Sequence, residues 1–133
     1  MARQWSEHLV DVPRPEFAFT LVALVDRMDI IGPSNAGVLR RFPMRSGTVE
    51  GPGIRGELLP GGADWQTLRP DGGLLLEAKH SFRTDDGVLV QVYNRGLAWL
   101  PGAASWPGPH LPTRTSAQFI APDGKYDCLR RYR

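Results

Sequence analysis

The sequence predicts an all-β fold, in the form of a small and mainly antiparallel β-barrel with a central cavity. Short segments rich in β-branched and aromatic residues alternate with tight turns, and no window combines a 3.6-residue periodicity with helix caps. Connections this short cannot hold crossover helices, so consecutive strands are expected to run antiparallel. A barrel is favoured over an open sheet because closure leaves no bare strand edges.

The first half of the chain predicts an arm followed by two strands. At 133 residues the chain has the size of one domain, which we place at 16–133 after an arm at 1–15. The segment Phe17–Val25 is the longest apolar run and predicts a buried strand, since it is too short to cross a membrane. A loop follows, and Val38–Arg45 predicts a second strand in which Pro43 indicates an edge or a bulge.

The segment Gly47–Trp65 contains six of the fifteen glycines in the chain and predicts bent β structure. Its strands are expected at Thr48–Glu50 and Ile54–Leu59, on either side of a Gly-Pro-Gly kink. Glycine inside a strand marks a bulge, a barrel corner or a close approach of another group to the backbone. Asp64 and Trp65 follow this kinked segment directly, where they are placed to line a pocket.

The second half predicts a meander. Strong turn signals at Pro70-Asp71-Gly72-Gly73 and at Asp85-Asp86-Gly87 connect consecutive strands as hairpins. The segment 97–115 is rich in proline and tryptophan and predicts a long rim loop or lid. The strands of this half are expected at 65–69, 74–84, 88–95 and 116–120, with a final piece at 125–133.

Composition excludes several classes of function. With 16 basic and 14 acidic residues the net charge is only +2, which does not predict a nucleic-acid interface. The single cysteine, Cys128, excludes an internal disulfide framework, and no export signal is visible, so a cytoplasmic location is expected. The three histidines lack metal-ligand spacing and no nucleotide or hydrolase motif occurs, so we expect no metal and no cofactor.

The alternation of side chains along the predicted strands identifies the first candidate residues. In 74–84 the mostly apolar face, which includes His80, is the natural interior of a barrel. His80 is there either a hydrogen-bonded core histidine or a catalytic base that works near neutral pH. Asp64 is either a general acid or base, whose pKa an apolar wall beside Trp65 would raise, or a turn aspartate that accepts backbone N–H bonds.

Five further candidate residues allow two interpretations each. Tyr93, with Gln91 on the same face of 88–95, either directs its hydroxyl into the cavity as an acid or oxyanion donor, or is an aromatic residue of the outer face. Glu50 and Arg55 flank the Gly-Pro-Gly kink, where a buried ion pair would serve structure or ligand binding equally. Trp65 likewise fills the core or stacks on a ligand.

The order of these motifs resembles the family named domain of unknown function 3237. The resemblance covers Phe17 to Leu129 and rests on the motifs Gly-Thr-Val-Glu-Gly-Pro at 47–52, Gly-Glu-Leu-Leu-Pro-Gly-Gly-Ala-Asp-Trp at 56–65, Arg-Pro-Asp-Gly at 69–72, Thr-Asp-Asp-Gly at 84–87 and Tyr-Asn-Arg-Gly at 93–96. It implies a small barrel similar to lipocalin-like and allene-oxide-cyclase-like proteins, with a central cavity and no agreed activity.

One departure from the family pattern concerns the C-terminal end. Members follow a Tyr-x-Trp-Leu-Asn element with further strand, whereas this chain has only Tyr126-Asp127-Cys128-Leu129-Arg130 and three more residues. The resemblance makes Tyr126 a candidate cavity residue and implies a barrel short of its final strand. Because a second copy would cover the open edge, we expect a homodimer.

The function expected from these residues is the binding of an apolar or aromatic small molecule. Asp64, Tyr93 and His80 would carry a cofactor-free acid-base reaction of the isomerase, cyclase, lyase or hydratase type, with Trp65, Glu50, Arg55, Gln91 and Tyr126 as ligand-binding residues. Two alternatives stay open. The same cavity would serve a non-catalytic carrier or sensor, or the loop at 97–115 would dock on a protein partner.

Overall fold

The protein is an antiparallel sheet of eight strands followed by one short helical turn, as described by a computed structural model for residues 14–99 and 113–131. The predicted all-β, antiparallel fold class is confirmed. The elements are β1 (Thr20–Val25), β2 (Asp29–Ser34), β3 (Gly37–Gly51), β4 (Ile54–Leu58), β5 (Ala63–Leu68), β6 (Gly73–Thr84), β7 (Leu89–Trp99), β8 (Thr115–Ile120) and the 3-10 helix η1 (Asp127–Arg130).

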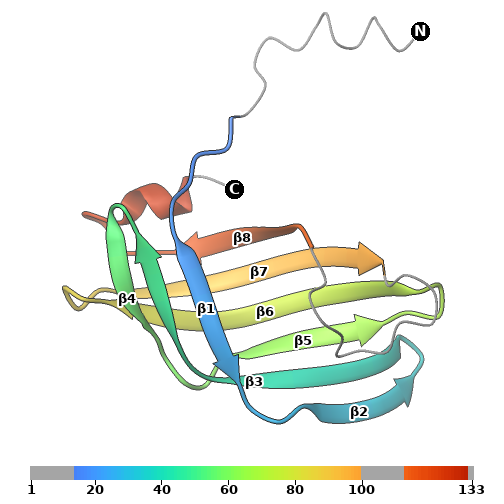
Figure 1. Ribbon diagram of the computed structural model, residues 1–133. Coiled ribbons are helices and arrows are strands. Elements are labelled where there is room, and N and C mark those ends of the chain that lie inside the picture. Colours follow the sequence, from blue (N-terminus) through green and yellow to red (C-terminus); the bar gives the residue numbers. More distant parts are fainter. Residues whose placement is uncertain (1–13, 100–112, 132–133) are drawn as a thin grey trace, which may run out of the picture.

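The sheet curves so strongly that its first strand passes over its middle (Figure 1). The strand order is β1-β3-β4-β6-β7-β8, while β2 pairs with β3, and β5 pairs with both β3 and β6. In the described part of the chain β1 and β8 share no ladder, which leaves a seam between the two edges. The Phe19 ring lies 5.9 Å from the rings of both Phe82 and Phe119 in edge-to-face geometry, so aromatic packing bridges this seam.

Strand β3 organises the sheet because its two halves have different neighbours. Its first half pairs with β2 and β5, and its second half with β1 and β4. The register shifts beside Arg45, close to Pro43, where a bulge was expected. The strands predicted at 38–45 and 48–50 are therefore one bulged strand. The loop predicted after Val25 is wrong in part, because β2 forms there as an edge strand that tolerates Pro33.

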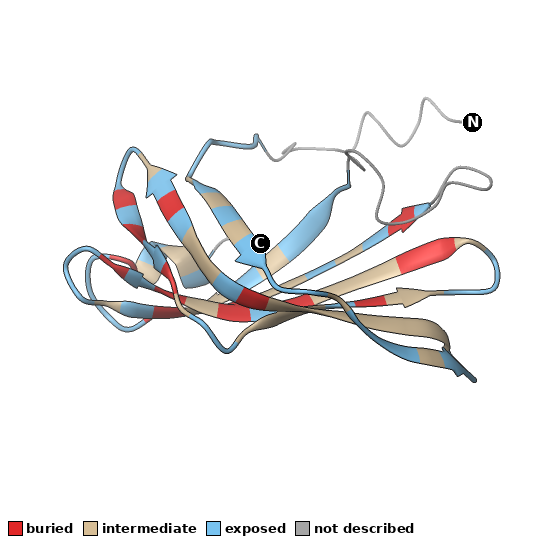
Figure 2. Cartoon of the chain, turned by 60° about the horizontal axis from the view of Figure 1, so that its bottom comes forward, coloured by how far each residue is buried: buried red, intermediate tan, exposed pale blue. Residues whose placement is uncertain are grey.

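Buried and exposed residues alternate along parts of several strands (Figure 2). In β6 the side chains of Leu74, Ala78, His80 and Phe82 are buried, and the intervening Lys79 is exposed. The interior face predicted for 74–84 is thus confirmed, and we call it the inner face. One apolar cluster fills one end of this face and consists of Val49, Ile54, Phe82, Val90, Val92, Ala121 and Tyr126.

A second, smaller cluster lies beneath β1. Met44, Leu58 and Ala78 form it, and Leu21 and Ala23 of β1 pack against it. Strand β1 therefore covers part of the inner face of β6. Since hydrophobic burial is the main favourable term in folding, these contacts hold the curved strand on the sheet.

The glycine-rich segment brings backbone close to β6. A Cβ atom at Gly62 would lie 2.6 Å from Cβ of His80 and 2.7 Å from the carbonyl oxygen of Lys79, distances that side chains do not tolerate. The expected close approach is confirmed here. Only a residue without a side chain lets the segment before β5 pass beside His80.

The C-terminal residues form η1 instead of a further strand. Tyr126 is buried just before η1, and its hydroxyl donates a hydrogen bond of 2.7 Å to Oδ1 of Asp86. Residues 97–99 of the predicted loop belong to β7, whereas 100–112 and most of the predicted arm, 1–13, lie outside the described residues. Within the residues described, no helix has the length and apolar character needed to cross a membrane.

Candidate functional site

Five polar side chains occupy the inner face on four adjacent strands. We call this group the inner polar belt; its members are Arg40 on β3, Asp64 and Gln66 on β5, His80 on β6 and Asn94 on β7. Alternation along each strand directs all five to the same face as the apolar core. The belt is therefore built from residues that are distant in sequence and adjacent in the sheet.

The strand register fixes how the belt residues lie. Arg40 pairs with Gln66, and Asp64 pairs with Ala78, which in turn pairs with Asn94. Because neighbouring strands are about 4.8 Å apart, the backbones of Asp64 and Asn94 are roughly 10 Å apart across Ala78. Ala78, between the two polar groups, is buried and belongs to the cluster beneath β1. His80 lies two positions along β6 from Ala78.

The belt contains every buried polar side-chain atom that has no hydrogen-bond partner in the described part of the chain. These atoms are Nη1 of Arg40, Oε1 of Gln66, Nδ1 and Nε2 of His80, and Oδ1 of Asn94. Within the belt, Nε2 of Gln66 donates a hydrogen bond of 2.8 Å to Oδ2 of Asp64. A buried polar atom left unpaired costs about 1–3 kcal/mol, so the belt favours further polar partners beyond those that the described residues supply.

Burial shifts the pKa values of Asp64 and His80 in opposite directions. Desolvation raises the pKa of Asp64 above 3.8, and the hydrogen bond from Gln66 only partly offsets this rise. Desolvation also lowers the pKa of His80 below 6.5, because burial disfavours the imidazolium ion. A carboxyl that keeps its proton to higher pH can act as a proton donor, and an imidazole that stays neutral can act as a proton acceptor.

The burial of Asp64 makes stability depend on pH. With a raised pKa in the folded state, the stabilising contribution of the protonated carboxyl is complete below pH 3.8 and is lost as pH rises through the folded pKa. We expect Asp64→Asn, which cannot ionise, to melt at a higher temperature than the wild type at pH 7 and at a similar temperature at pH 3. Thermal melts followed by circular dichroism at both pH values measure this.

The matched control for that variant is Asp123→Asn. Asp123 is exposed and forms an ion pair with Arg130, with 2.6 Å between Oδ1 and Nη2. Its replacement also removes one carboxylate, but from the surface, so no gain in melting temperature is expected at pH 7. A loss of stability in Asp64→Asn at pH 7 would contradict an unfavourable buried carboxylate.

Tyr93 and Gln91 lie on the outer face, opposite His80. Tyr93 pairs with Lys79 and Gln91 with Ser81, and these partners belong to the outward positions of β6. The prediction that Tyr93 and Gln91 share a cavity with His80 is wrong, because the register of the β6–β7 hairpin places them in the outward alternation.

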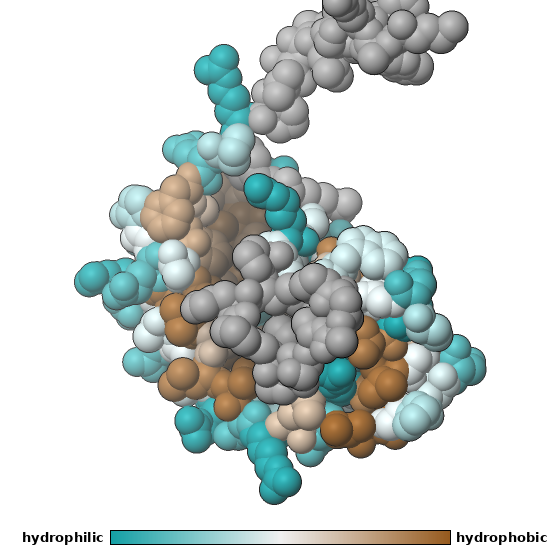
Figure 3. Space-filling model, turned by 45° about the vertical axis from the view of Figure 1, so that its right-hand side comes forward, coloured by the Kyte–Doolittle hydropathy of each residue, from teal (hydrophilic) through white to brown (hydrophobic). Residues whose placement is uncertain are grey.

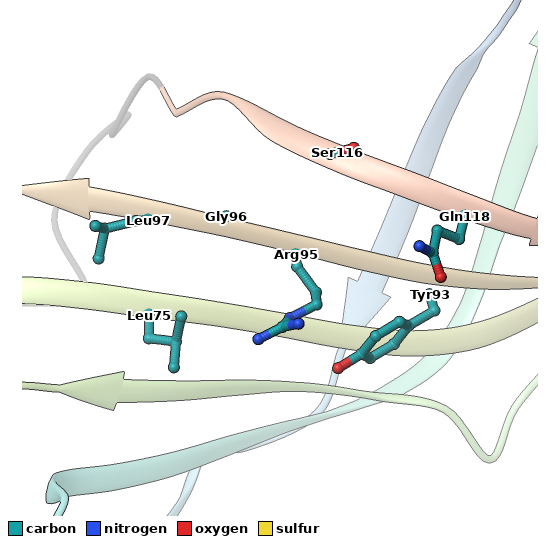
Figure 4. Close-up of a pocket in the computed structure, with 7 residues that line it drawn as sticks. All are labelled: Leu75, Tyr93, Arg95, Gly96, Leu97, Ser116 and Gln118. Carbon is teal, nitrogen blue, oxygen red and sulfur yellow. The ribbon is translucent and has the colours of Figure 1, made fainter. Parts of the chain in front are cut away.

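The outer face has a depression of its own, open to solvent and with a volume of about 340 Å³. Figure 4 shows its lining residues, which are Leu75, Tyr93, Arg95, Gly96, Leu97, Ser116 and Gln118. Here the charged groups are satisfied, since Nη2 of Arg95 lies 3.3 Å from Oε1 of Glu77 and its guanidinium carbon 5.9 Å from the centre of the Tyr93 ring. The unsatisfied atoms of the inner polar belt make the belt the stronger candidate site.

The other predicted ligand-binding residues also lie away from the belt. Glu50 and Arg55 are 3.8 Å apart, between Oε1 and Nη2, but both side chains are about 70% exposed, so the predicted buried pair is wrong. Trp65 is on the outer face, where the guanidinium carbon of Arg41 lies 5.8 Å from the ring centre. Tyr126 belongs to the apolar cluster at the end of the inner face and has its hydroxyl satisfied.

Three belt residues were not predicted as site residues from the sequence. On its strand face Arg40 lies between Val38 and Phe42, and Asn94 lies between Val92 and Gly96, whereas Gln66 lies between Asp64 and Leu68. A polar residue at one inward position of an otherwise apolar strand face is the signal that identifies Arg40 and Asn94. Among the described residues, His, Cys, Asp and Glu side chains form no group of three or more that could hold a metal ion.

Comparison with known proteins places the chain in a family. The family described as protein of unknown function (DUF3237) matches residues 13–132. The chain belongs to this family. A UPF0311 protein of Rhodopseudomonas palustris strain TIE-1 is 42% identical over 86 residues, which cover 65% of this chain and 56% of that protein. The chain thus spans a little over half the length of this curated relative.

Other DUF3237 comparisons extend over more of the chain. A UPF0311 protein of Clostridium acetobutylicum strain ATCC 824 is 32% identical over 112 residues, which cover 84% of this chain and 67% of that protein. The crystal structure of a conserved protein of unknown function, RPA1785 from Rhodopseudomonas palustris, has a TM-score of 0.80 and 35% identity, and the match covers 91% of this chain and 86% of that one.

A second solved structure bears on the barrel-like architecture. A beta-barrel like protein from Acinetobacter baumannii has a TM-score of 0.63 and 26% identity, with 90% of this chain and 85% of that one covered. The resemblance to the DUF3237 family inferred from the motifs is confirmed, together with its barrel-like fold.

Proposed function

We propose that this DUF3237 protein binds a small organic molecule against the inner polar belt. The observation that carries the proposal is the gathering of unpartnered buried atoms, from Arg40, Gln66, His80 and Asn94, on four adjacent strands. Scattered defects of packing would not share one face. Ligand sites are typically apolar surfaces with a few convergent polar groups, which is the composition of this inner face.

Access to the inner face supports the proposal. Asp64 and Asn94 are half-buried, whereas Gln66 and His80 are buried. Seen from its right-hand side, the described part of the molecule has a hollow with apolar (brown) atoms at depth (Figure 3). A ligand that enters from the accessible edge of the belt would meet Asp64 and Asn94 before the deeper groups.

Native mass spectrometry of the protein purified from cells tests the proposal. We expect a small molecule that stays bound under gentle conditions and is released on denaturation. Gln66→Leu removes a buried amide of the belt and should reduce the bound fraction about tenfold or more, because one lost hydrogen bond to a buried partner costs about 1–3 kcal/mol.

The control uses the same substitution on the opposite face. Gln91→Leu changes an outward-facing glutamine of β7 and should retain the bound molecule. Ligand-free wild-type protein, or full retention of the molecule by Gln66→Leu, would contradict binding at the belt.

Acid-base catalysis is the second candidate function. The opposite pKa shifts of Asp64 and His80, on neighbouring strands, favour proton transfer to or from a bound molecule without a cofactor, as in isomerase, cyclase, lyase or hydratase chemistry. If so, when the released molecule is returned to the protein in D₂O, the wild type should exchange one of its carbon-bound protons for deuterium. His80→Gln should not. Without exchange or turnover the protein would be a carrier or sensor.

Several expectations from the sequence stay predictions. They are the homodimer, the cytoplasmic location and the absence of a nucleic-acid partner. Most of the loop predicted at 97–115, to which a docking role was assigned, lies outside the described residues.

A further inference from the structure

The half-buried Arg40 lies on the inner face, where the carboxyl group of the belt, Asp64, is hydrogen-bonded to Gln66 and forms no ion pair with Arg40. The Nη1 atom of Arg40 is buried without a hydrogen-bond partner, and none of the ion pairs among residues 14–99 and 113–131 includes it. An arginine side chain keeps its positive charge under all physiological conditions. Because an unpaired buried charge is costly, buried guanidinium groups are normally matched by an anion.

We propose that the inner polar belt selects molecules that carry a single carboxylate, bound by Arg40, on an apolar body. This inference rests on the proposed binding function and adds the chemical class of the ligand. The guanidinium fork binds a planar carboxylate through two parallel hydrogen bonds, and Oε1 of Gln66, the cross-strand neighbour of Arg40, is left to accept a hydrogen bond from a hydroxyl or amide of the same molecule.

The charge balance of the belt favours one negative charge over two. Besides Arg40, the titratable groups of the belt are Asp64 and His80. Burial holds His80 toward its neutral form, so it adds little positive charge, and an ionised Asp64 would oppose a second negative charge. With Asp64 protonated, a carboxylate cancels the single guanidinium charge, whereas a doubly charged phosphate would leave an excess.

Apolar rows on both sides of the belt determine the rest of the ligand. One row crosses β3, β5, β6 and β7 as Val38, Leu68, Leu74 and Ala98. The other crosses β4, β6 and β7 as Leu58, Phe82 and Val90. Of these side chains Val38 and Leu68 are half-buried and accessible, so a ligand whose carboxylate lies at Arg40 extends along them, which favours a ring or short hydrocarbon chain as its body.

The test compares three probes with one ring system: 2-naphthoate, neutral 2-naphthamide and 2-naphthyl phosphate. Titrations of ¹⁵N-labelled full-length protein, followed by the amide signals of Gly62, Ala78 and Asn94, locate and quantify binding at the belt. In the wild type, 2-naphthoate is expected to bind roughly tenfold to a hundredfold more tightly than 2-naphthamide, the range that charge-assisted hydrogen bonds provide.

Neighbouring arginines provide a matched pair of variants. Arg40→Met should abolish the preference for 2-naphthoate while 2-naphthamide still binds. Arg41→Met, one position along β3, alters an outer-face arginine that is paired with Asp29, with 2.7 Å between Nη2 and Oδ2, and should keep the preference. Arg40→Lys, which keeps the charge without the fork, should retain part of the preference and serves if Arg40→Met does not fold.

The outcomes separate this inference from the function on which it rests. Equal affinity for 2-naphthoate and 2-naphthamide, or an equal loss of both in Arg40→Met, would overturn carboxylate selection and leave small-molecule binding intact. Tighter binding of 2-naphthyl phosphate would overturn the preference for a single negative charge. If no probe shifts the amide signals of the belt, the inference fails, and native mass spectrometry of the protein purified from cells decides separately whether the proposed function fails with it.

Discussion

Phe82→Ala is expected to lower the free energy of unfolding by about 3–5 kcal/mol. The Phe82 side chain is 0% exposed and lies in the apolar cluster at the end of the inner face. Its ring also contacts that of Phe19 with 5.9 Å between centres, so its loss leaves a cavity and removes an aromatic contact. Since domains are stable by only about 5–15 kcal/mol, the loss is a large fraction of the total.

Urea denaturation followed by circular dichroism measures this loss. The control is Leu89→Ala in the neighbouring strand, where the side chain is 48% exposed and the expected cost is below about 1 kcal/mol. Similar costs for the two variants would contradict the assignment of the core to this end of the inner face.

Gly62→Ala is expected to destabilise the protein by about 3 kcal/mol and to disturb the inner polar belt as well. The added methyl group would meet the carbonyl oxygen of Lys79 at 2.7 Å and Cβ of His80 at 2.6 Å. Neither atom is the end of a flexible side chain, so the backbone of β6 must move. That movement displaces the imidazole of His80 relative to Asp64.

Two measurements test this prediction, and Gly53→Ala is the control because a Cβ atom there meets nothing within 4 Å. Urea denaturation should separate the two variants by about 2 kcal/mol or more. The ring signals of His80 should shift in Gly62→Ala and stay unchanged in Gly53→Ala. Equal stability of the two variants would show that the close approach at Gly62 is unimportant.

The parts of the fold that follow local chemistry were predictable from the sequence. The turn at Pro70–Gly73 has its Gly72 at φ +87°, and the turn before β7 has Gly87 at the same angle, a conformation that glycine adopts without strain. Alternation along β6 also identified the inward position of His80. The identification of Asp64 rested on its place after the glycine-rich segment, which the structure explains through Gly62.

The parts that depend on pairing between strands were not predictable. β2 forms because β3 offers it a partner, although Gly32 and Pro33 locally favour a loop. The outward position of Tyr93 depends on the register of β7 against β6, and a shift by one residue would reverse it. Arg40 is a charged residue in a strand, which is normally expected to face solvent, and only the pairing of β3 with β5 turns it inward.

The seam between β1 and β8 affects how the protein folds. Thr20 with Glu50 and Val38 with Leu68 are the most separated ladder partners among the described residues, at thirty positions along the chain. A ladder across the seam would instead join the two ends of the domain, at a greater cost in loop-closure entropy. Without it the contact order stays low for a barrel-like sheet, which favours rapid folding. The packing of Phe19 on Phe119 can then form last, between ladders already complete.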